Sequence, residues 1–436
     1  MKSGGMQISP AFLHSGNRPE QPSKGSSLER VVIVLAEKIL YIKNDMFRKN
    51  SSFDMEKERL SAMNNILLEN IRCIITGSYR EGKTDLNTLS NPALIRVDRR
   101  TVTPSLKGVP KLPERQKRAV RRFYRPYVRR MTDRYHRYYT SKNGVFRPDY
   151  LPEELYVTQV DRYFSDRQEA RFLDNKCYYY RLFSNVKQPE LIGMRIGGSW
   201  LDGRLLPVSY AHLKKRMQKE QELVIKRAVN SQGGYGVHFL SGSEVKRKLD
   251  ERIRTIPCDL VIQRPVRQHP DLARLHPESV NTLRIVSLLT QEKVKIYAVC
   301  LKIGVGKERV DNGCHGGIYC GVRPDGRLRK LGVTDDGRTV ERHPQLGYRF
   351  EEQRVPCLKS ALTLVRRAHP FMGRFRLISW DIAIDEKGEA VLIEANLSLG
   401  GINDVQICSG PLFGRDTKKV LDEVFRNRRR KWNIWF

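Results

Sequence analysis

The stretch ISWDIAIDEKGEAVLIEAN, residues 378–396, is the part of the sequence that decides the predicted fold. Two apolar runs flank a short turn of charged residues and one glycine. This pattern is typical of an antiparallel hairpin, with strands at 378–384 and 390–395. The acidic residues inside these strands then become the first candidates for function.

The predicted hairpin brings two carboxylates together. If Asp385 lies opposite Ala390, then Asp381 lies opposite Glu394 on the same face. Opposed side chains have Cβ atoms about 4.5–5.5 Å apart, so these carboxylates repel unless a positive group lies between them. Mg²⁺ meets this need, because it prefers oxygen ligands and commonly binds one or two carboxylates plus phosphate oxygens. Asn396, one pleat beyond Glu394, adds an amide oxygen.

The alternative to a metal site is a solvent-facing acidic patch on an ordinary hairpin. Asp381 and Glu394 both lie among apolar residues. Acidic side chains in such strands are rarely buried without a partner, which favours the metal site.

A second candidate segment has the features of a phosphate-binding loop. The apolar strand Leu223–Lys226 ends in a cation and is followed by SQGGYG, residues 231–236. Glycines let a loop approach phosphate closely, and its backbone N–H groups form an anion nest. The segment matches neither the P-loop nor the dinucleotide-binding glycine pattern, and an ordinary hairpin turn is the alternative. The candidate residues in this loop are Ser231, Gly233, Gly234 and Gly236.

The strand Leu260–Gln263 is a candidate for the adenine edge, with a plain buried strand as the equally good alternative. Further β-rich runs occur at 283–289, 294–303 and 317–322, and helical patterns occur at 210–221 and 353–369. Because strands and helices do not alternate strictly, the predicted class is α+β.

The charge and cysteine content indicate the setting of the protein. The 436 residues carry a formal net charge of +32, which predicts an anionic partner. The eight cysteines form no C-x-x-C motif, so we expect reduced thiols in the cytoplasm. We find neither a secretory signal nor an apolar run long enough to span a membrane. Cys314, His315 and Cys320 lie close together, but their spacing matches no common zinc pattern.

An arginine-rich helix is predicted at about Glu114–Tyr139. Its apolar residues recur every three or four positions, at Val120, Tyr124, Tyr127, Met131, Tyr135 and Tyr138, and arginines fill the other faces. We favour a helix packed on the body of the protein with a solvated basic face. The alternative is a docking surface for a phosphorylated, anionic lipid at the inner membrane face, for a nucleic acid or for an acidic glycan. We expect no specific nucleic-acid partner.

Several motifs in order resemble the ATP-grasp superfamily, and within it the sugar-transfer associated ATP-grasp family, over about residues 165–415. The segments that carry the resemblance are 174–176 with 187–189, 224–226 with 231–237, 276–284, 311–317 with 343–344, 379–381 and 393–396. The resemblance implies an ATP-grasp fold, in which two α+β subdomains hold the nucleotide. The implied regions are a tail at 1–27, a basic, mainly helical region at 28–150, N-terminal and phosphate-loop subdomains at 151–290, and a metal-binding subdomain with a basic tail at 291–436.

The resemblance also implies residue roles. Lys176 and Lys226 would contact ATP, Gln263 would belong to the adenine hinge, and Asn281 and Arg284 would lie near the γ-phosphate or the acceptor. The metal ligands would be Asp381, Glu394 and Asn396. The residue after the phosphate-strand lysine is often proline in such proteins, whereas here it is Arg227.

The implied activity is that of an ATP-dependent ligase that works through an acyl phosphate. The cofactors would be ATP and Mg²⁺, with Mn²⁺ able to substitute, and the substrates a small carboxylate and an amine or sugar acceptor in polysaccharide synthesis. Two alternatives stay open. One is a kinase on the same fold, and the other is a basic protein that binds nucleic acid or a membrane surface.

Overall fold

The computed structural model describes residues 65–74, 86–229, 231, 234–307, 309, 316–334 and 337–426. The predicted tail at 1–27 and most of the basic C-terminal run lie outside these residues. Within the described part of the chain, no helix is long and apolar enough to cross a membrane.

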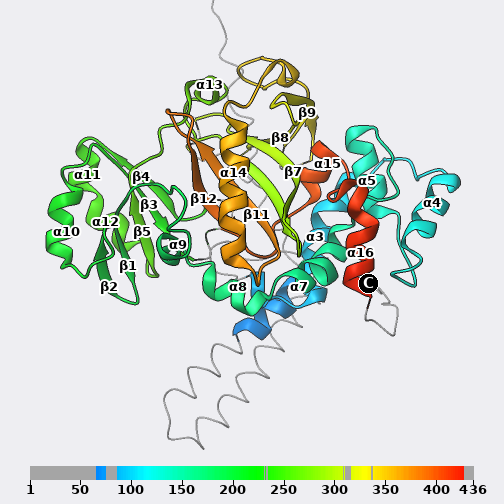
Figure 1. Cartoon of the computed structure of the whole chain (residues 1–436), viewed down its shortest axis with the longest axis horizontal. Helices are drawn as coiled ribbons and strands as arrows, with labels where there is room; N and C mark the ends of the chain where they lie inside the picture. Colours follow the sequence, from blue (N-terminus) through cyan, green and yellow to red (C-terminus); the bar gives the residue numbers. More distant parts are fainter. Residues whose placement is uncertain are drawn as a thin grey trace, which may run out of the picture.

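Two antiparallel sheets form the body of the molecule (Figure 1). The small sheet has the order β2-β1-β5-β3-β4, with β1 (Leu191–Ile196), β2 (Ser199–Asp202), β3 (Glu222–Arg227), β4 (Val237–Ser241) and β5 (Leu260–Gln263). The large sheet has the order β10-β9-β8-β7-β6-β11-β12, with β6 (Leu283–Leu289), β7 (Val294–Ile303), β8 (Ile318–Val322), β9 (Leu328–Thr334), β10 (Thr339–Val340), β11 (Leu377–Ile384) and β12 (Ala390–Asn396). The small sheet ends with β5 and the large sheet begins with β6 at Leu283, seven residues before the predicted boundary at residue 290.

The small sheet is apolar on the face that its helices cover. Alternate residues such as Leu223 and Ile225 pack into the core formed with these helices, while Val224 and Lys226 face the other way and line a cavity. The covering helices are α10 (Tyr210–Met217), α11 (Ser243–Arg247) and α12 (Leu249–Arg254). On the other face, Met194 and Val261 pack with Cys177 of α9 (Lys176–Leu182), and only the part near Val224 and Lys226 lines the cavity.

The large sheet is covered on both faces. On one face α14 (Leu358–Ala368) packs over residues such as Ile285, Ile382 and the fully buried Trp380. On the other face, Val286 and Cys300 pack against the N-terminal helices and the helices near the C-terminus. Figure 1 shows α14 in front of β11 and β7, with α3, α5, α15 and α16 to one side.

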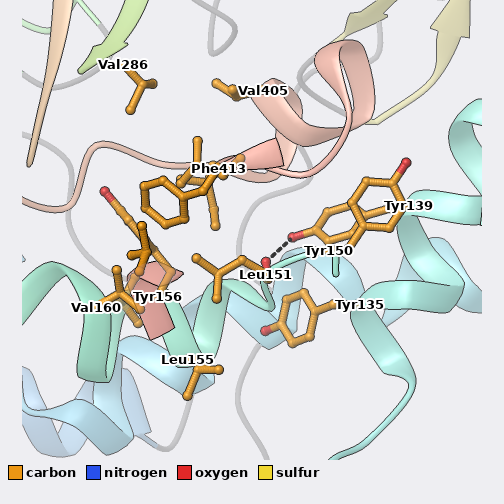
Figure 2. Packing of buried hydrophobic residues seen from close by; sticks show 14 of the residues in the cluster. Tyr135, Tyr139, Tyr150, Leu151, Leu155, Tyr156, Val160, Val286, Val405 and Phe413 are labelled. Atoms are coloured by element: carbon orange, nitrogen blue, oxygen red, sulfur yellow. Dashed lines mark hydrogen bonds between the residues drawn. The ribbon is translucent and has the colours of Figure 1, made fainter. Parts of the chain in front are cut away.

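We call residues 86–164 the N-terminal layer. It contains α3 (Asn91–Val102), α4 (Glu114–Tyr124), α5 (Arg134–Asn143), α6 (Glu153–Leu155), a π-helical turn at Tyr156–Val160 and α7 (Asp161–Phe164). Buried tyrosines join it to the rest of the molecule: Tyr139 and Tyr150 pack with their ring centroids 5.0 Å apart, near Phe413 (Figure 2). Further helices include α8 (Arg167–Leu173), α9 (Lys176–Leu182), α13 (Pro270–Ala273), α15 (Asn403–Ser409) and α16 (Thr417–Phe425).

The single helix predicted at Glu114–Tyr139 is wrong, because the chain forms two helices there. The helix α4 ends at Tyr124 and α5 begins at Arg134. Pro126 lies between them, and proline has no N–H to donate while its ring clashes with the preceding turn. The apolar stripe is nevertheless buried, apart from the half-buried Met131, which agrees with packing on the body of the protein.

The α+β class is confirmed, and most predicted strands appear within a residue of their expected bounds. The prediction missed β1, β2, β4, β9 and β10. The helix predicted at 353–369 begins only at Leu358. Cys357 directly before it has a φ of +49°, which is a left-handed conformation that does not continue a helix.

Candidate functional site

A cavity between the two sheets brings most of the candidate residues together. Its small-sheet wall contains Val224, Lys226, Val237, Phe239 and Gln263, and its other walls contain Lys176, Pro189, Ser231, Gly234, Arg264, Pro265, Val266, Val280, Thr282, Lys302, Arg309, Asp381, Ile393 and Glu394. Cationic and acidic side chains thus lie in one cavity that also has apolar walls.

Asp381 and Glu394 lie directly opposite each other across β11 and β12, as predicted. The predicted turn is nonetheless one residue out, since Ile384 rather than Asp385 lies opposite Ala390. A β-bulge between the two register segments adds Ile393, which restores the predicted pairing of the two carboxylates. Bulges re-aim side chains next to functional sites, and Ile393 lines the cavity here.

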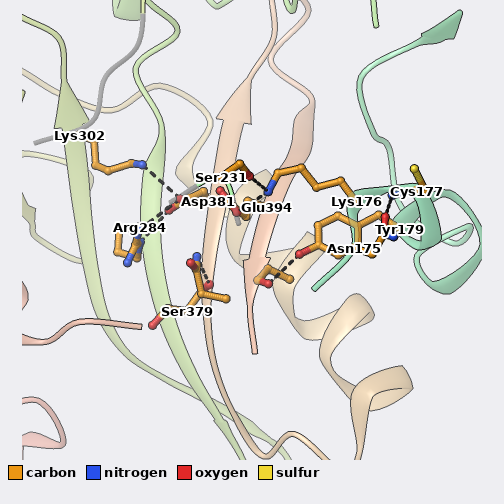
Figure 3. Close-up of polar contacts among 12 residues, drawn as sticks. Asn175, Lys176, Cys177, Tyr179, Ser231, Arg284, Lys302, Ser379, Asp381 and Glu394 are labelled. Atoms are coloured by element: carbon orange, nitrogen blue, oxygen red, sulfur yellow. Dashed lines mark hydrogen bonds and ion pairs between the residues drawn. The ribbon is translucent and has the colours of Figure 1, made fainter. Parts of the chain in front are cut away.

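Each carboxylate has a cationic partner (Figure 3). Asp381 Oδ1 accepts a hydrogen bond from Arg284 Nε at 2.7 Å, and Lys302 Nζ lies 3.2 Å from Asp381 Oδ2. Glu394 Oε1 lies 2.7 Å from Lys176 Nζ, which also donates to Ser231 Oγ at 2.8 Å. Three cations therefore offset the charges of the two carboxylates.

Burial and ion pairing act in opposite directions on these groups. Burial disfavours the Asp381 carboxylate, but Arg284 and Lys302 outweigh it and hold the pKa of Asp381 below its usual value. Burial likewise disfavours the Lys176 ammonium, but Glu394 outweighs it and raises the pKa of Lys176. Both groups are therefore charged across the neutral pH range.

The first turn of α9 places Lys176. Asn175 caps this helix, because its side chain accepts a hydrogen bond from Cys177 N at 2.9 Å. The Asn175 amide also donates to Asp259 Oδ2 at 2.8 Å, and Lys176 N donates to Ala228 O at 2.9 Å. Local capping thus fixes Lys176 between the end of the small sheet and Glu394.

The donor set fits a magnesium ion. Two carboxylates line the cavity at opposed positions, and each carboxylate offers about four lone-pair sites, so the ion pairs leave positions for a metal. Asn396 lies two residues after Glu394 on the same strand, opposite Ser379, and its amide donates to Ser379 O at 3.0 Å. That bond occupies the side-chain nitrogen, and the role of Asn396 as a ligand stays a prediction, since it is not among the residues that line the cavity.

The predicted phosphate loop and hinge lie at the small-sheet end of the cavity. Lys226, Ser231 and Gly234 line it, and Gly233 lies outside the described residues. Gly236 has a φ of +73°, and a Cβ there would meet the Arg227 side chain at 2.5 Å. Gln263 donates to Tyr180 Oη at 2.5 Å, and the segment 263–266 continues along the cavity wall.

Arg284 and Asn281 occupy different environments from the cavity wall. Arg284 is bound to Asp381 and also donates from Nη1 to Gly400 O at 3.0 Å. Asn281 is fully buried, and its side chain donates to Gln268 and two backbone carbonyls and accepts from Gly304 N. The amide of Asn281 is thus committed to the surrounding loop, and its place near the γ-phosphate or the acceptor stays a prediction.

Sequence reasoning missed Lys302 as a candidate. Its side chain is only 3% exposed, yet it lines the cavity beside Asp381. The signal was present as a cation inside the apolar strand 294–303. The argument that singled out Asp381, a charge among apolar residues, applies equally to Lys302. Arg309 and Thr282 were missed as well, and neither carries such a signal.

The arginine-rich surface lies far from this cavity. On and after α4, Arg115, Arg118, Arg121, Arg122, Arg125, Arg129 and Arg130 are all exposed. Figure 1 places α4 at the opposite side of the molecule from the small sheet. The described residues contain no group of three or more His, Cys, Asp or Glu suited to a metal ion, and Cys314 and His315 lie outside them.

Comparison with known proteins gives distant matches among solved structures. No curated protein matches the chain. Among solved structures, an L-amino acid ligase from Bacillus licheniformis is similar at 15% identity and a TM-score of 0.34, over 61% of this chain and 52% of that chain. A D-alanine–D-alanine ligase from Bacillus anthracis is similar at 12% identity and a TM-score of 0.33, over 58% of this chain and 66% of that chain. The chain thus spans about half to two thirds of the length of these structures.

A family model provides the stronger match. The model described as sugar-transfer associated ATP-grasp matches residues 157–421, which is more than half of the chain. This range contains both sheets and every residue that lines the cavity. The chain therefore belongs to the sugar-transfer associated ATP-grasp family.

Proposed function

We propose that the chain is a Mg-ATP-dependent ligase that activates a small carboxylate, such as an amino acid, and joins it to an amine of a sugar or glycan precursor. One observation carries this proposal. A single cavity between the two sheets holds Lys176, Lys226 and Lys302 together with the opposed Asp381 and Glu394. Cations that suit phosphates and carboxylates that suit a metal thus meet beside a hinge that suits a base.

The layout of the cavity supports one orientation of the nucleotide. The base lies against Val224 and the hinge segment 263–266, where apolar walls and backbone groups meet. The phosphates extend toward Lys176, Lys226 and Ser231. The terminal phosphate then lies nearest to Lys302 and the carboxylate pair, where the charges are most deeply buried.

Asp381, Glu394 and Asn396 would hold the magnesium ion. When bound, the ion neutralises phosphate charge and orients the phosphate oxygens for transfer. Lys302 and Arg284 add fixed positive charge beside Asp381, which favours the charge that develops on the transferred phosphoryl group. Because the chain positions reactants rather than attacking them, it needs no nucleophilic side chain.

The reaction has two steps. A carboxylate oxygen of the substrate attacks the γ-phosphorus, the bond from that phosphorus to the bridging oxygen breaks, and ADP leaves with an acyl phosphate formed. The acceptor amine then attacks the acyl carbon, the C–O bond to phosphate breaks, and inorganic phosphate and one proton are released. A hydroxyl acceptor would follow the same steps.

The variant Glu394→Gln tests the proposal, because it keeps the size of the side chain but removes its charge. We expect ATP-dependent product formation to fall about 10³-fold. ADP release is measured with Mg²⁺ against pooled amino acids and amino sugars, and products are identified by mass spectrometry. Glu389→Gln is the matched control, because Glu389 belongs to the same hairpin but lies outside the cavity, paired with Lys187.

An unchanged rate in Glu394→Gln, with the fold intact by circular dichroism, contradicts the proposal. A phosphorylated product in place of a condensed one supports the kinase alternative. The metal arm of the assay replaces Mg²⁺ with Mn²⁺, which we expect to sustain turnover, since Mn²⁺ also binds oxygen ligands.

A further inference from the structure

The loop 397–402 connects the metal-binding strand β12 to α15 and lies against the strand that carries Asp381. A Cβ on Gly400 would meet Ser379 Oγ at 2.4 Å, so the loop backbone packs directly on β11. Gly400 O also accepts the hydrogen bond from Arg284 Nη1 at 3.0 Å. The position of this loop therefore sets one of the contacts that orient Arg284 toward Asp381.

The loop contains a residue in an unfavourable backbone conformation. Leu399 has a φ of +54°, in the left-handed region that residues with a Cβ rarely adopt. Such conformations persist only where the surrounding structure holds them. The N–H of Leu399 donates to Asp161 Oδ1 at 3.0 Å, so the partner at the strained residue comes from the N-terminal layer.

The same layer holds the rest of the loop. Ile402 N donates to Glu153 Oε2 at 2.9 Å, and the Ser398 hydroxyl donates to Asn87 Oδ1 at 2.5 Å. Just beyond the loop, Asn403 donates to Asp98 Oδ1 at 3.0 Å. Asp161 is fully buried and Glu153 is 6% exposed, so these carboxylates contact the loop and not solvent.

We propose that Asp161 and Glu153 are positioning residues of this site: they hold loop 397–402 so that Gly400 O binds Arg284 and thereby orients Arg284 toward Asp381. The catalytic unit then includes the N-terminal layer, although the family match begins only at residue 157. The expected effect of these residues on enzyme activity rests on the proposed function.

Two substitutions of Asp161 form a matched pair. Asp161 also forms an ion pair with Arg167 at 3.5 Å, and both Asp161→Asn and Asp161→Ala remove that charge. Only Asp161→Asn keeps an oxygen that accepts the Leu399 N–H. The difference between the two variants therefore isolates the hydrogen bond to the loop.

We expect Asp161→Ala to lower kcat at least tenfold and to change KM for ATP less than twofold, because the lysines and hinge of the cavity lie on other segments. Asp161→Asn is expected to stay within about threefold of the unmodified protein. Adding Leu399→Gly to Asp161→Ala should restore part of kcat, since glycine adopts a φ near +54° without strain. Chemical denaturation of both variants separates this effect from a general gain in stability, because glycine at this φ also relieves strain in the folded protein.

Hydrogen exchange of the peptide 397–403 provides a readout that needs no activity. It is expected to be faster in Asp161→Ala than in Asp161→Asn. If Asp161→Ala does not fold, Glu153→Gln and Glu153→Ala form the second pair, because only the glutamine keeps an acceptor for Ile402 N.

Equal exchange and equal kcat in Asp161→Ala and Asp161→Asn overturn the inference. A second outcome is faster exchange in Asp161→Ala than in Asp161→Asn, while the unmodified protein forms no ATP-dependent product. That outcome supports the loop contact and contradicts the proposed function. The two failures are thus distinguished.

Discussion

The small sheet and the large sheet face each other across the cavity, but they carry charge differently. Lys226 is half-buried at the end of β3, among apolar residues such as Val224 and Val237. In the large sheet, Asp381 lies opposite Arg284 on the adjacent strand, and Lys302 pairs with the same carboxylate from the strand beyond. The small sheet thus offers a half-buried cation among apolar walls, whereas the large sheet offers a deeply buried network of charges.

This difference teaches where substitutions are costly. A deeply buried ion pair that loses one partner leaves an uncompensated charge, whereas a change at the half-buried Lys226 removes a charge from a less buried position. We therefore expect large-sheet variants to lose stability and activity together. Small-sheet variants should change mainly the binding of the nucleotide.

The largest effect is expected for Asp381→Asn. The change leaves Arg284 and Lys302 buried beside a neutral amide, so the free energy of unfolding should fall by about 3–5 kcal/mol. ATP-dependent turnover should fall about 10³-fold. Chemical denaturation and ADP release measure the two quantities, and Glu389→Gln is expected to change neither. If Asp381→Asn is as stable as the unmodified protein, the buried charges of the large sheet do not depend on one another as the comparison with the small sheet requires.

The pair Lys302→Met and Lys226→Met sharpens the comparison. Lys302→Met should lower kcat about 10²-fold and also lower the free energy of unfolding, because Asp381 loses a buried partner. Lys226→Met should raise KM for ATP and leave stability closer to that of the unmodified protein. Steady-state kinetics with varied ATP and denaturant titrations check both. A larger stability loss in Lys226→Met than in Lys302→Met contradicts the assignment of the deeply buried position to Lys302 and the half-buried position to Lys226.

The pH dependence of stability gives a smaller effect with a definite sign. The folded-state pKa of Asp381 is lowered, since Arg284 and Lys302 outweigh the effect of burial. Its contribution to stability is therefore present above the unfolded-state pKa of about 3.9 and is lost as pH falls through the lower folded-state pKa. The difference in free energy of unfolding between the unmodified protein and Asp381→Asn should stay level above about pH 4 and shrink below it. Chemical denaturation of both proteins at several pH values from about 2.5 to 7 measures this difference.

The smallest effect on activity is expected at the arginine surface, which belongs to neither sheet. The triple change of Arg118, Arg122 and Arg125 to Gln should leave ATP turnover unchanged. It should weaken the binding of vesicles that contain anionic phospholipid, most clearly at low salt, because such contacts are screened by ions. Vesicle co-sedimentation checks this, with neutral vesicles as the control. If the triple variant binds anionic vesicles as well as the unmodified protein does, the arginine surface is a solvated face with no lipid partner.

Much of the site could be read from local patterns. Alternation of apolar and polar residues placed the strands, and a charge inside such a strand marked Asp381 and Glu394. The opposed pair was predicted through a wrong turn register, which the bulge at Ile393 offsets. A bulge adds one residue without a characteristic sequence signal, so the register of a hairpin does not follow from the turn alone.

Other residues could not be assigned from local pattern. Asn281 occurs in a motif that resembles the family, yet its side chain forms hydrogen bonds with the loop that surrounds it. Pro126 was the local signal that separates α4 from α5, and a regular apolar stripe hid it. A stripe reports which residues are buried, and it reports nothing about whether the backbone between them stays helical.

The sequence by itself determined the α+β class, most of the strands that line the cavity and the identities of the charged residues, because these depend on periodicity and on residues near in the chain. Only the tertiary structure decided which cation pairs with which carboxylate and which helices hold the loop after β12. Lys176 and Glu394 are 218 residues apart, and Asp161 and Leu399 are 238 apart. Such contacts form only when separate elements pack together, since no local preference specifies a partner at that distance.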